Sequence, residues 1–158
     1  MPHGPTISMT NDAMALKRGE AQVIDWLSEH AAAAGHHFQN DKVLFEHREG
    51  DKVTGALVAV FGVAWCFVEL LATDPGSRRS GVGRALMARV EEQARQRNMT
   101  GIWLDTYTFQ APAFYEALGY QRVGRIDDYP PGEARVFYAK RMDGRPDNVP
   151  GDCGTSRA

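Results

Sequence analysis

One stretch decides the fold of this chain: Leu71-Ala72-Thr73-Asp74-Pro75-Gly76-Ser77-Arg78-Arg79-Ser80-Gly81-Val82-Gly83-Arg84-Ala85-Leu86. An apolar strand runs into a turn, and a loop with two glycines then opens an amphipathic helix. The first amides of a helix lack an intrahelical acceptor, and the helix dipole adds positive potential, so this junction suits an anion. We expect Gly81 and Gly83 to let a phosphate touch the backbone, while Arg78, Arg79 and Arg84 add positive charge.

Two familiar phosphate-binding motifs do not fit this loop. A Walker loop closes on Gly-Lys-Ser/Thr, which the stretch lacks. A dinucleotide-binding turn needs a third glycine, and Leu86 stands at that position. A different class of phosphate-bearing ligand is therefore expected.

The hydrophobic periodicity along the chain predicts a mixed sheet with helices packed on it. We expect helices over Asn11–Ala34, Gly81–Asn98 and Pro112–Leu118, and strands over Lys42–His47, Val53–Phe61, Trp65–Thr73, Ile102–Tyr107, Tyr120–Ile126 and Arg135–Lys140. This order indicates an α/β (α+β) fold with a mixed, mostly antiparallel central sheet and flanking helices. We expect one domain over residues 1–142, with a loose lead-in over 1–10, and a disordered tail over 143–158.

The helix Gly81–Asn98 has the clearest two-sided pattern. Its expected buried stripe consists of Val82, Ala85, Leu86, Val90 and Ala94. Glu91 and Arg95 fall on the expected solvent side, where they form a favourable i,i+4 pair.

Composition sets outer limits on function. The chain has 158 residues, 43% of them hydrophobic and 24% charged, which is ordinary for a globular domain. The formal net charge of −2 gives no basic excess for nucleic acid or an anionic membrane. Cys66 and Cys153 form neither a disulfide framework nor a zinc motif, and no metal site is expected. With no signal peptide or membrane span visible, a cytoplasmic protein is predicted.

The loop and its surroundings resemble a known family. Pro75–Gly83 resembles the Arg/Gln-x-x-Gly-x-Gly/Ala signature of the GCN5-related N-acetyltransferase (GNAT) superfamily, and Phe67–Leu71 and Thr108–Tyr120 also look like that family. The resemblance covers roughly Val43–Met142. It implies the acyl-CoA N-acyltransferase fold, acetyl-CoA as co-substrate, and direct attack of a primary amine on the thioester. A homodimer is a further expectation from the family.

The resemblance also implies the residues that carry the chemistry. Tyr115 matches the family tyrosine near the thioester sulfur, where a protonated phenol can donate to the leaving thiolate. Glu69 is the candidate base, and strand alternation would place it on the face of Phe67 and Leu71. The alternative for Glu69 is a structural carboxylate that anchors a neighbouring amide or arginine.

Binding residues follow from the same likeness. The predicted CoA-binding residues are Leu71, Thr73, Arg78, Arg79, Ser80, Gly81, Val82, Gly83, Arg84 and Gln110, the last replacing an asparagine found in many relatives. The predicted acceptor-binding residues are Asp105, Tyr107, Asp128 and Tyr129, and for the loop acids the alternative is a solvated turn.

Two other functions stay open at this stage. A non-catalytic acyl-CoA-binding or sensing module could use the same loop, although the presence of both proton carriers argues against it. A nucleotide-binding regulator is disfavoured by the missing Walker lysine. The sequence leaves the acceptor open among an antibiotic, a polyamine, an amino acid, a ribosomal N-terminus and a lysine side chain.

Overall fold

The computed structural model describes residues 6–146, which form two compact units divided between Phe38 and Gln39. Residues 1–5 of the predicted lead-in and residues 147–158 of the predicted tail lie outside the described residues. Within the described part of the tail, Asp143 pairs with Arg141 and Arg145. The single domain over residues 1–142 stays a prediction.

The N-terminal unit contains helix α1 (Ala13–Ala33), close to the predicted bounds. Its first turn is capped by Asp12, whose carboxylate accepts a hydrogen bond from the Ala15 amide at 2.8 Å. Gly35 follows the helix with a φ of +79°, as expected for a helix stop. None of the helices in the described part of the chain is long and apolar enough to cross a membrane.

The second unit is built on a six-stranded sheet. Its elements are β1 (Asp41–Glu49), β2 (Lys52–Phe61), β3 (Trp65–Thr73), the short 3-10 turn η1 (Pro75–Ser77), α2 (Val82–Gln96), β4 (Gly101–Tyr107), α3 (Pro112–Ala117), β5 (Gln121–Asp127) and β6 (Ala134–Arg141). The strand order is β1-β2-β3-β4-β6-β5, with β3 and β4 parallel and the other described pairs antiparallel. The predicted mixed, mostly antiparallel sheet is confirmed, and every expected element lies within two residues of its predicted ends.

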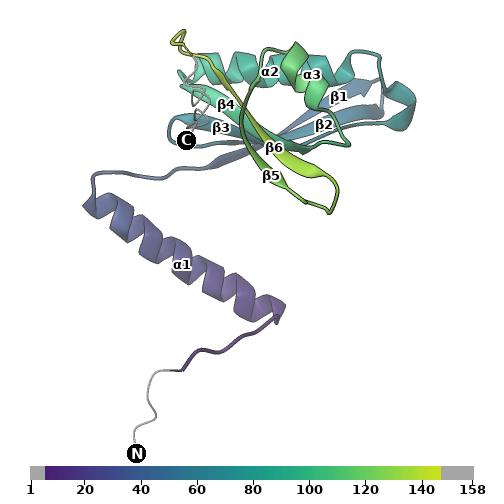
Figure 1. Cartoon of the computed structure of the whole chain (residues 1–158). Coiled ribbons are helices and arrows are strands. Elements are labelled where there is room, and N and C mark those ends of the chain that lie inside the picture. The colour runs from purple at the N-terminus through teal and green to yellow at the C-terminus, as the bar shows by residue number, and fades with distance from the viewer. Residues whose placement is uncertain (1–5, 147–158) are drawn as a thin grey trace, which may run out of the picture. The chain divides into compact units, whose positions relative to one another are not determined.

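Helices α2 and α3 lie along the same face of this sheet (Figure 1). The fully buried side chains beneath α2 come from four strands, among them Leu57, Cys66, Ile102, Leu104 and Val136. Burial of this apolar face is the main force that holds the helices against the sheet.

The predicted stripe of α2 needs two corrections. Ala85 is exposed and Met87 is fully buried, so the buried stripe lies closer to Met87 than the pattern indicated. Glu91 was expected in solvent but is only 8% exposed. The Glu91 carboxylate can be buried because Lys140 of β6 and Arg95 pair with it, at 2.8 Å and 3.1 Å, and these pairs offset the cost of removing its charge from water.

The centre of the sheet opens at one end. An extra residue, Glu69, interrupts the β2–β3 ladder, since Ala59 pairs with Val68 and Val58 pairs with Leu70. Just before this bulge, the parallel β3–β4 pairing ends at Val68 and Leu104. Beyond it, β3 stays paired to β2 and β4 stays paired to β6. We call the unjoined segments, 69–73 of β3 and 105–107 of β4, the parted strand ends.

Candidate functional site

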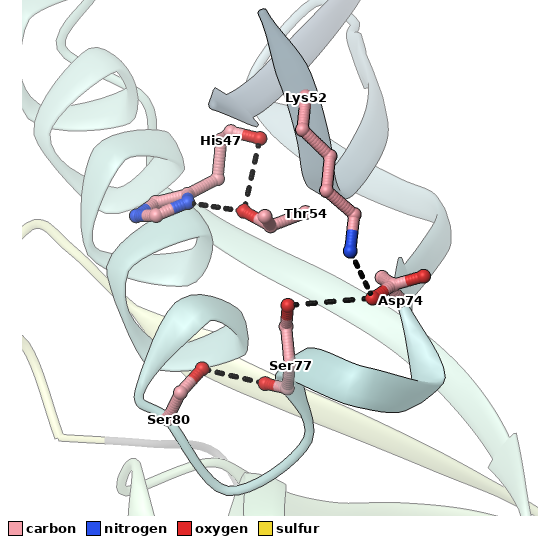
Figure 2. A network of polar contacts seen from close by, with 6 residues as sticks. All are labelled: His47, Lys52, Thr54, Asp74, Ser77 and Ser80. Atoms are coloured by element: carbon pink, nitrogen blue, oxygen red, sulfur yellow. Dashed lines mark hydrogen bonds and ion pairs between the residues drawn. The ribbon is translucent and has the colours of Figure 1, made fainter. Parts of the chain in front are cut away.

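The loop that follows β3 is held by polar contacts to the β1–β2 hairpin (Figure 2). The carboxylate of Asp74 accepts from Lys52 Nζ at 3.0 Å and from Ser77 Oγ at 3.5 Å. The Asp74 amide donates to the Thr54 oxygen at 2.9 Å. The hydrogen bond from Lys52 lowers the pKa of Asp74, so this anchor is charged at neutral pH. The start of α2 is therefore fixed relative to the sheet.

The N-terminus of α2 has no side-chain cap. Its N-cap residue is Gly81, with a left-handed φ of +87° that an L-residue rarely adopts. The first helical bond described here runs from the Ala85 amide to the Gly81 oxygen, at 2.9 Å. The amides of Val82, Gly83 and Arg84 precede it and no side chain caps them. An acceptor from outside the chain can satisfy these donors.

Unpaired positive charge surrounds these amides. Arg78, Arg79 and Arg84 are all exposed, and within the described residues none of the three has a carboxylate at ion-pair distance. Arg89 and Arg95, further along the same helix, each pair with a glutamate. The uncapped amides and the three free guanidinium groups fit a pyrophosphate.

The two glycines of the loop serve different purposes. A Cβ added to Gly81 would meet no atom within 4 Å, so its backbone conformation is what requires glycine. A Cβ added to Gly83 would lie 3.3 Å from Phe114 Cζ and 3.9 Å from Thr73 Cγ2. The missing side chain at Gly83 thus lets α3 and the end of β3 pack against the start of α2.

Tyr115 lies in α3 and is 7% exposed. Its ring packs edge-on against Phe114 and Tyr120, and tilted against Tyr138. Burial, with a smaller contribution from the negative charge of Asp105, raises the pKa of Tyr115 to about 12. The phenol is therefore protonated at neutral pH, as its predicted role requires.

Glu69 occupies the bulge of β3. Its Oε2 lies 2.6 Å from Lys42 Nζ of β1, and its side chain is 36% exposed. The expectation that Glu69 shares a face with both Phe67 and Leu71 is wrong, because the extra residue puts Phe67 and Leu71 on opposite faces. The carboxylate is thus ion-paired and accessible to water.

Leu71 and Thr73, predicted to bind the pantetheine arm, lie on the parted end of β3. They pair with Leu57 and Gly55 of β2, which leaves the other edge of β3 without a strand partner among the described residues. Gln110 is engaged locally: its Oε1 accepts from Thr106 Oγ1 and from the Tyr107 amide, both at 3.2 Å. Its carbonyl therefore secures the end of β4.

Three of the four predicted acceptor residues gather at the parted end of β4. Asp105 Oδ1 accepts from Arg135 Nε at 2.6 Å, and the ring of Tyr107 stacks on that of Tyr129. Asp128 has a φ of +54° and its carboxylate bonds to the Gly132 amide, as a turn residue would.

Sequence reasoning missed Phe109 and Arg135. The ring of Phe109 stacks on Tyr107, and Arg135 lies near the rings of Tyr107 and Tyr129. The alternation Tyr107-x-Phe109 was a usable signal for the first, while the pairing of β4 with β6 that places Arg135 has no local signature.

Comparisons with known proteins agree with this geometry. Residues 10–120 match the family model described as "Acetyltransferase (GNAT) family". Over 95 residues, the chain is 41% identical to the Blasticidin-S acetyltransferase of Streptomyces morookaense, an alignment that covers 60% of this chain and 70% of that relative. The chain belongs to the acetyltransferase (GNAT) family.

Solved structures show the same fold. An acetyltransferase from Bacillus cereus superposes with a TM-score of 0.71 at 23% identity, covering 86% of this chain and 97% of its own. An aminoglycoside 6'-N-acetyltransferase complexed with coenzyme A gives a TM-score of 0.59 at 19% identity, covering 67% and 76% of the two chains. Membership of this family makes the protein an acetyl-CoA-dependent N-acyltransferase, with acetyl-CoA as its co-substrate.

Proposed function

We propose that the protein transfers the acetyl group of acetyl-CoA to a primary amine on a small molecule or a peptide. One observation carries the proposal: the uncapped, arginine-rich start of α2 directly adjoins the parted strand ends, since Gly83 lies against Thr73. An anion site and an unpaired strand edge are then next to each other, and a CoA thioester needs both.

The co-substrate would be held by the chain's backbone more than by its side chains. The amides of Val82, Gly83 and Arg84 receive the pyrophosphate, and Arg78, Arg79 and Ser80 border it. The free edge of β3 around Leu71 and Thr73 offers amide and carbonyl groups to the pantetheine arm, as a neighbouring strand would. This arrangement directs the thioester toward α3, where Tyr115 lies.

Acyl transfer then needs two proton movements. The amine nitrogen attacks the thioester carbonyl, so that a C–N bond forms and the C–S bond breaks. Tyr115, which is protonated, donates its proton to the leaving sulfur. Glu69 accepts the proton that the amine loses, through a water molecule that its exposed position admits.

The acceptor would enter beside Asp105, Tyr107 and Tyr129, with Asp128 on the same hairpin loop. Asp105 couples the two halves of the site, because its charge acts on Tyr115 while its carboxylate holds Arg135. The relative named for blasticidin-S supports testing an antibiotic amine first. The homodimer and the cytoplasmic location stay predictions.

Calorimetric titration of acetyl-CoA into wild type, Arg84→Glu and Arg89→Glu tests the binding half of this proposal. Both substitutions reverse one charge on the same helix, but only Arg84 lies at its uncapped end. We expect micromolar affinity in wild type and Arg89→Glu, and at least tenfold weaker binding in Arg84→Glu.

Thiol release with a broad amine panel tests the catalytic half. We expect turnover with some amine and a large loss in Tyr115→Phe. No thiol release with any amine, together with identical behaviour of Tyr115→Phe, would refute N-acetyl transfer by this site.

A further inference from the structure

Three aromatic rings stack at the parted end of β4, and two of them, Phe109 and Tyr129, are exposed. Tyr107 stacks on Phe109 with ring centroids 5.2 Å apart and planes 7° apart. It also stacks on Tyr129, at 5.8 Å and 15°. We call these three residues the aromatic shelf. Because the three planes are nearly parallel, the exposed rings of Phe109 and Tyr129 share a common orientation.

The shelf is held from two sides. Arg135 bonds to Asp105 and places its guanidinium 5.9 Å from the Tyr107 centroid and 5.5 Å from that of Tyr129. Thr108 joins the loop after β4 to the start of β6, because its hydroxyl bonds to the Glu133 carboxylate and accepts from the Ala134 amide. The rings are therefore ordered before any ligand arrives, which reduces the entropy cost of binding.

Core packing does not account for the shelf. Phe109 is 57% exposed and Tyr129 is 44% exposed, and neither belongs to the buried cluster beneath α2 and α3. Tyr107 lies two residues beyond Asp105 on the same face of β4, which is the acceptor end of the site proposed above. Exposed, preordered aromatic surface beside a reaction site is suited to a ligand.

We propose that the shelf binds a flat aromatic or heteroaromatic ring carried by the amine acceptor, a proposal that rests on the proposed acetyl transfer. Offset stacking adds attraction beyond simple burial, which corresponds to about a three- to tenfold gain in affinity. An aliphatic polyamine or a lysine side chain has no ring to place there. The acceptors are thus arylalkylamines and amines linked to a heteroaromatic ring.

A matched pair of amines tests the proposal. 2-Phenylethylamine and 2-cyclohexylethylamine share the amine and the spacer and differ only in whether the ring is flat. A merely apolar surface would favour the cyclohexyl compound at least equally. We expect a kcat/KM about three- to tenfold higher for the phenyl compound than for the cyclohexyl compound. When each amine is titrated into the CoA-loaded protein, the phenyl compound should also have the lower dissociation constant.

Substitutions locate the effect. Phe109→Leu and Tyr129→Leu each place an apolar side chain where a flat ring stood. The ratio of kcat/KM for the phenyl compound to that for the cyclohexyl compound should therefore fall toward one. Val63→Ala, which trims another exposed apolar side chain in the turn between β2 and β3, should leave the preference unchanged.

The outcomes separate the two proposals. Equal kcat/KM values and dissociation constants for the two amines in wild type would overturn the aromatic shelf as a ring site. An unchanged phenyl preference in both leucine variants would do the same. A phenyl preference in binding without thiol release from any amine would retain the shelf and refute the proposed acetyl transfer.

Discussion

The ammonium group of Lys140 on β6 lies 2.8 Å from the buried carboxylate of Glu91 on α2. The same nitrogen donates to the backbone oxygen of Leu118 at 2.8 Å, directly after α3 ends. One side chain thus connects the sheet with α2 and with the short helix that carries Tyr115. This contact therefore helps to hold α2 and the end of α3 in place relative to β6.

Replacing Lys140 with Met should destabilise the protein by about 2 kcal/mol, because the buried Glu91 then loses its lysine partner and keeps Arg95 as its cation. Urea unfolding measures the change. The double variant Lys140→Met with Glu91→Leu should regain much of the loss, since it removes the stranded charge as well. A double variant no more stable than the single one would show that the pair itself, and not the stranded carboxylate, sets the stability.

Replacing Tyr115 with Phe should lower kcat by about a hundredfold, because the leaving sulfur loses its proton donor while the ring packing is kept. Steady-state thiol release gives kcat, and calorimetry should show acetyl-CoA binding within about twofold of wild type. Tyr138→Phe is the matched control, because that buried ring packs against Tyr115 and its hydroxyl interacts with the surface side chains of Glu116 and Arg122. Similar losses in both variants would mean that Tyr115 acts through packing.

The pH profile of kcat should have no descending limb from Tyr115 up to about pH 10. The pKa of this phenol is raised from its ordinary 10 to about 12, so the neutral, proton-donating form predominates at every pH below about 12. The ascending limb should instead follow deprotonation of the amine. A rate that falls between pH 8 and 9 in wild type but not in Tyr115→Phe would contradict the raised pKa.

Glu69→Gln separates the two roles open to this carboxylate. A base that acts through water should lose about tenfold or more in kcat/KM, while Lys42→Met, which removes only the ion pair, should change it less than threefold. Both variants should unfold at similar urea concentrations, because an exposed ion pair contributes little stability. Equal losses of activity in the two variants would assign Glu69 to anchoring β3 on β1.

The elements and the glycine-bearing loop before α2 were predictable because their signals are local. Periodicity places α2 and β3, and the paired glycines mark the turn into the helix. The bulge at Glu69 was not predictable, because one extra residue in β3 is defined only against its partner β2. The burial of Glu91 likewise depends on Lys140, which is 49 positions away in the chain.

The residues of the candidate site also divide into those predictable from local motifs and those placed by non-local strand pairing. Tyr115 and the loop arginines follow from sequence motifs, and their roles stay predictions. Arg135 and the stacking of Phe109 on Tyr107 required the β4–β6 register and the hairpin loop, which are non-local. The reason for glycine at position 83 also became visible only through its contact with Phe114.

The parting of β3 from β4 has a consequence for how long the protein survives unfolding and proteolysis. The sheet lacks part of its central ladder, and the proposed seat of the pantetheine arm on the free edge of β3 would link ligand occupancy to folding stability. At a free concentration one hundred times the dissociation constant, such a ligand adds about 2.7 kcal/mol of stability. The amides of β3 beyond Val68 that point away from β2 should then exchange with solvent quickly in the free protein and slowly in the loaded one. The lifetime of this enzyme would therefore follow the supply of its acyl donor, falling when acetyl-CoA is scarce.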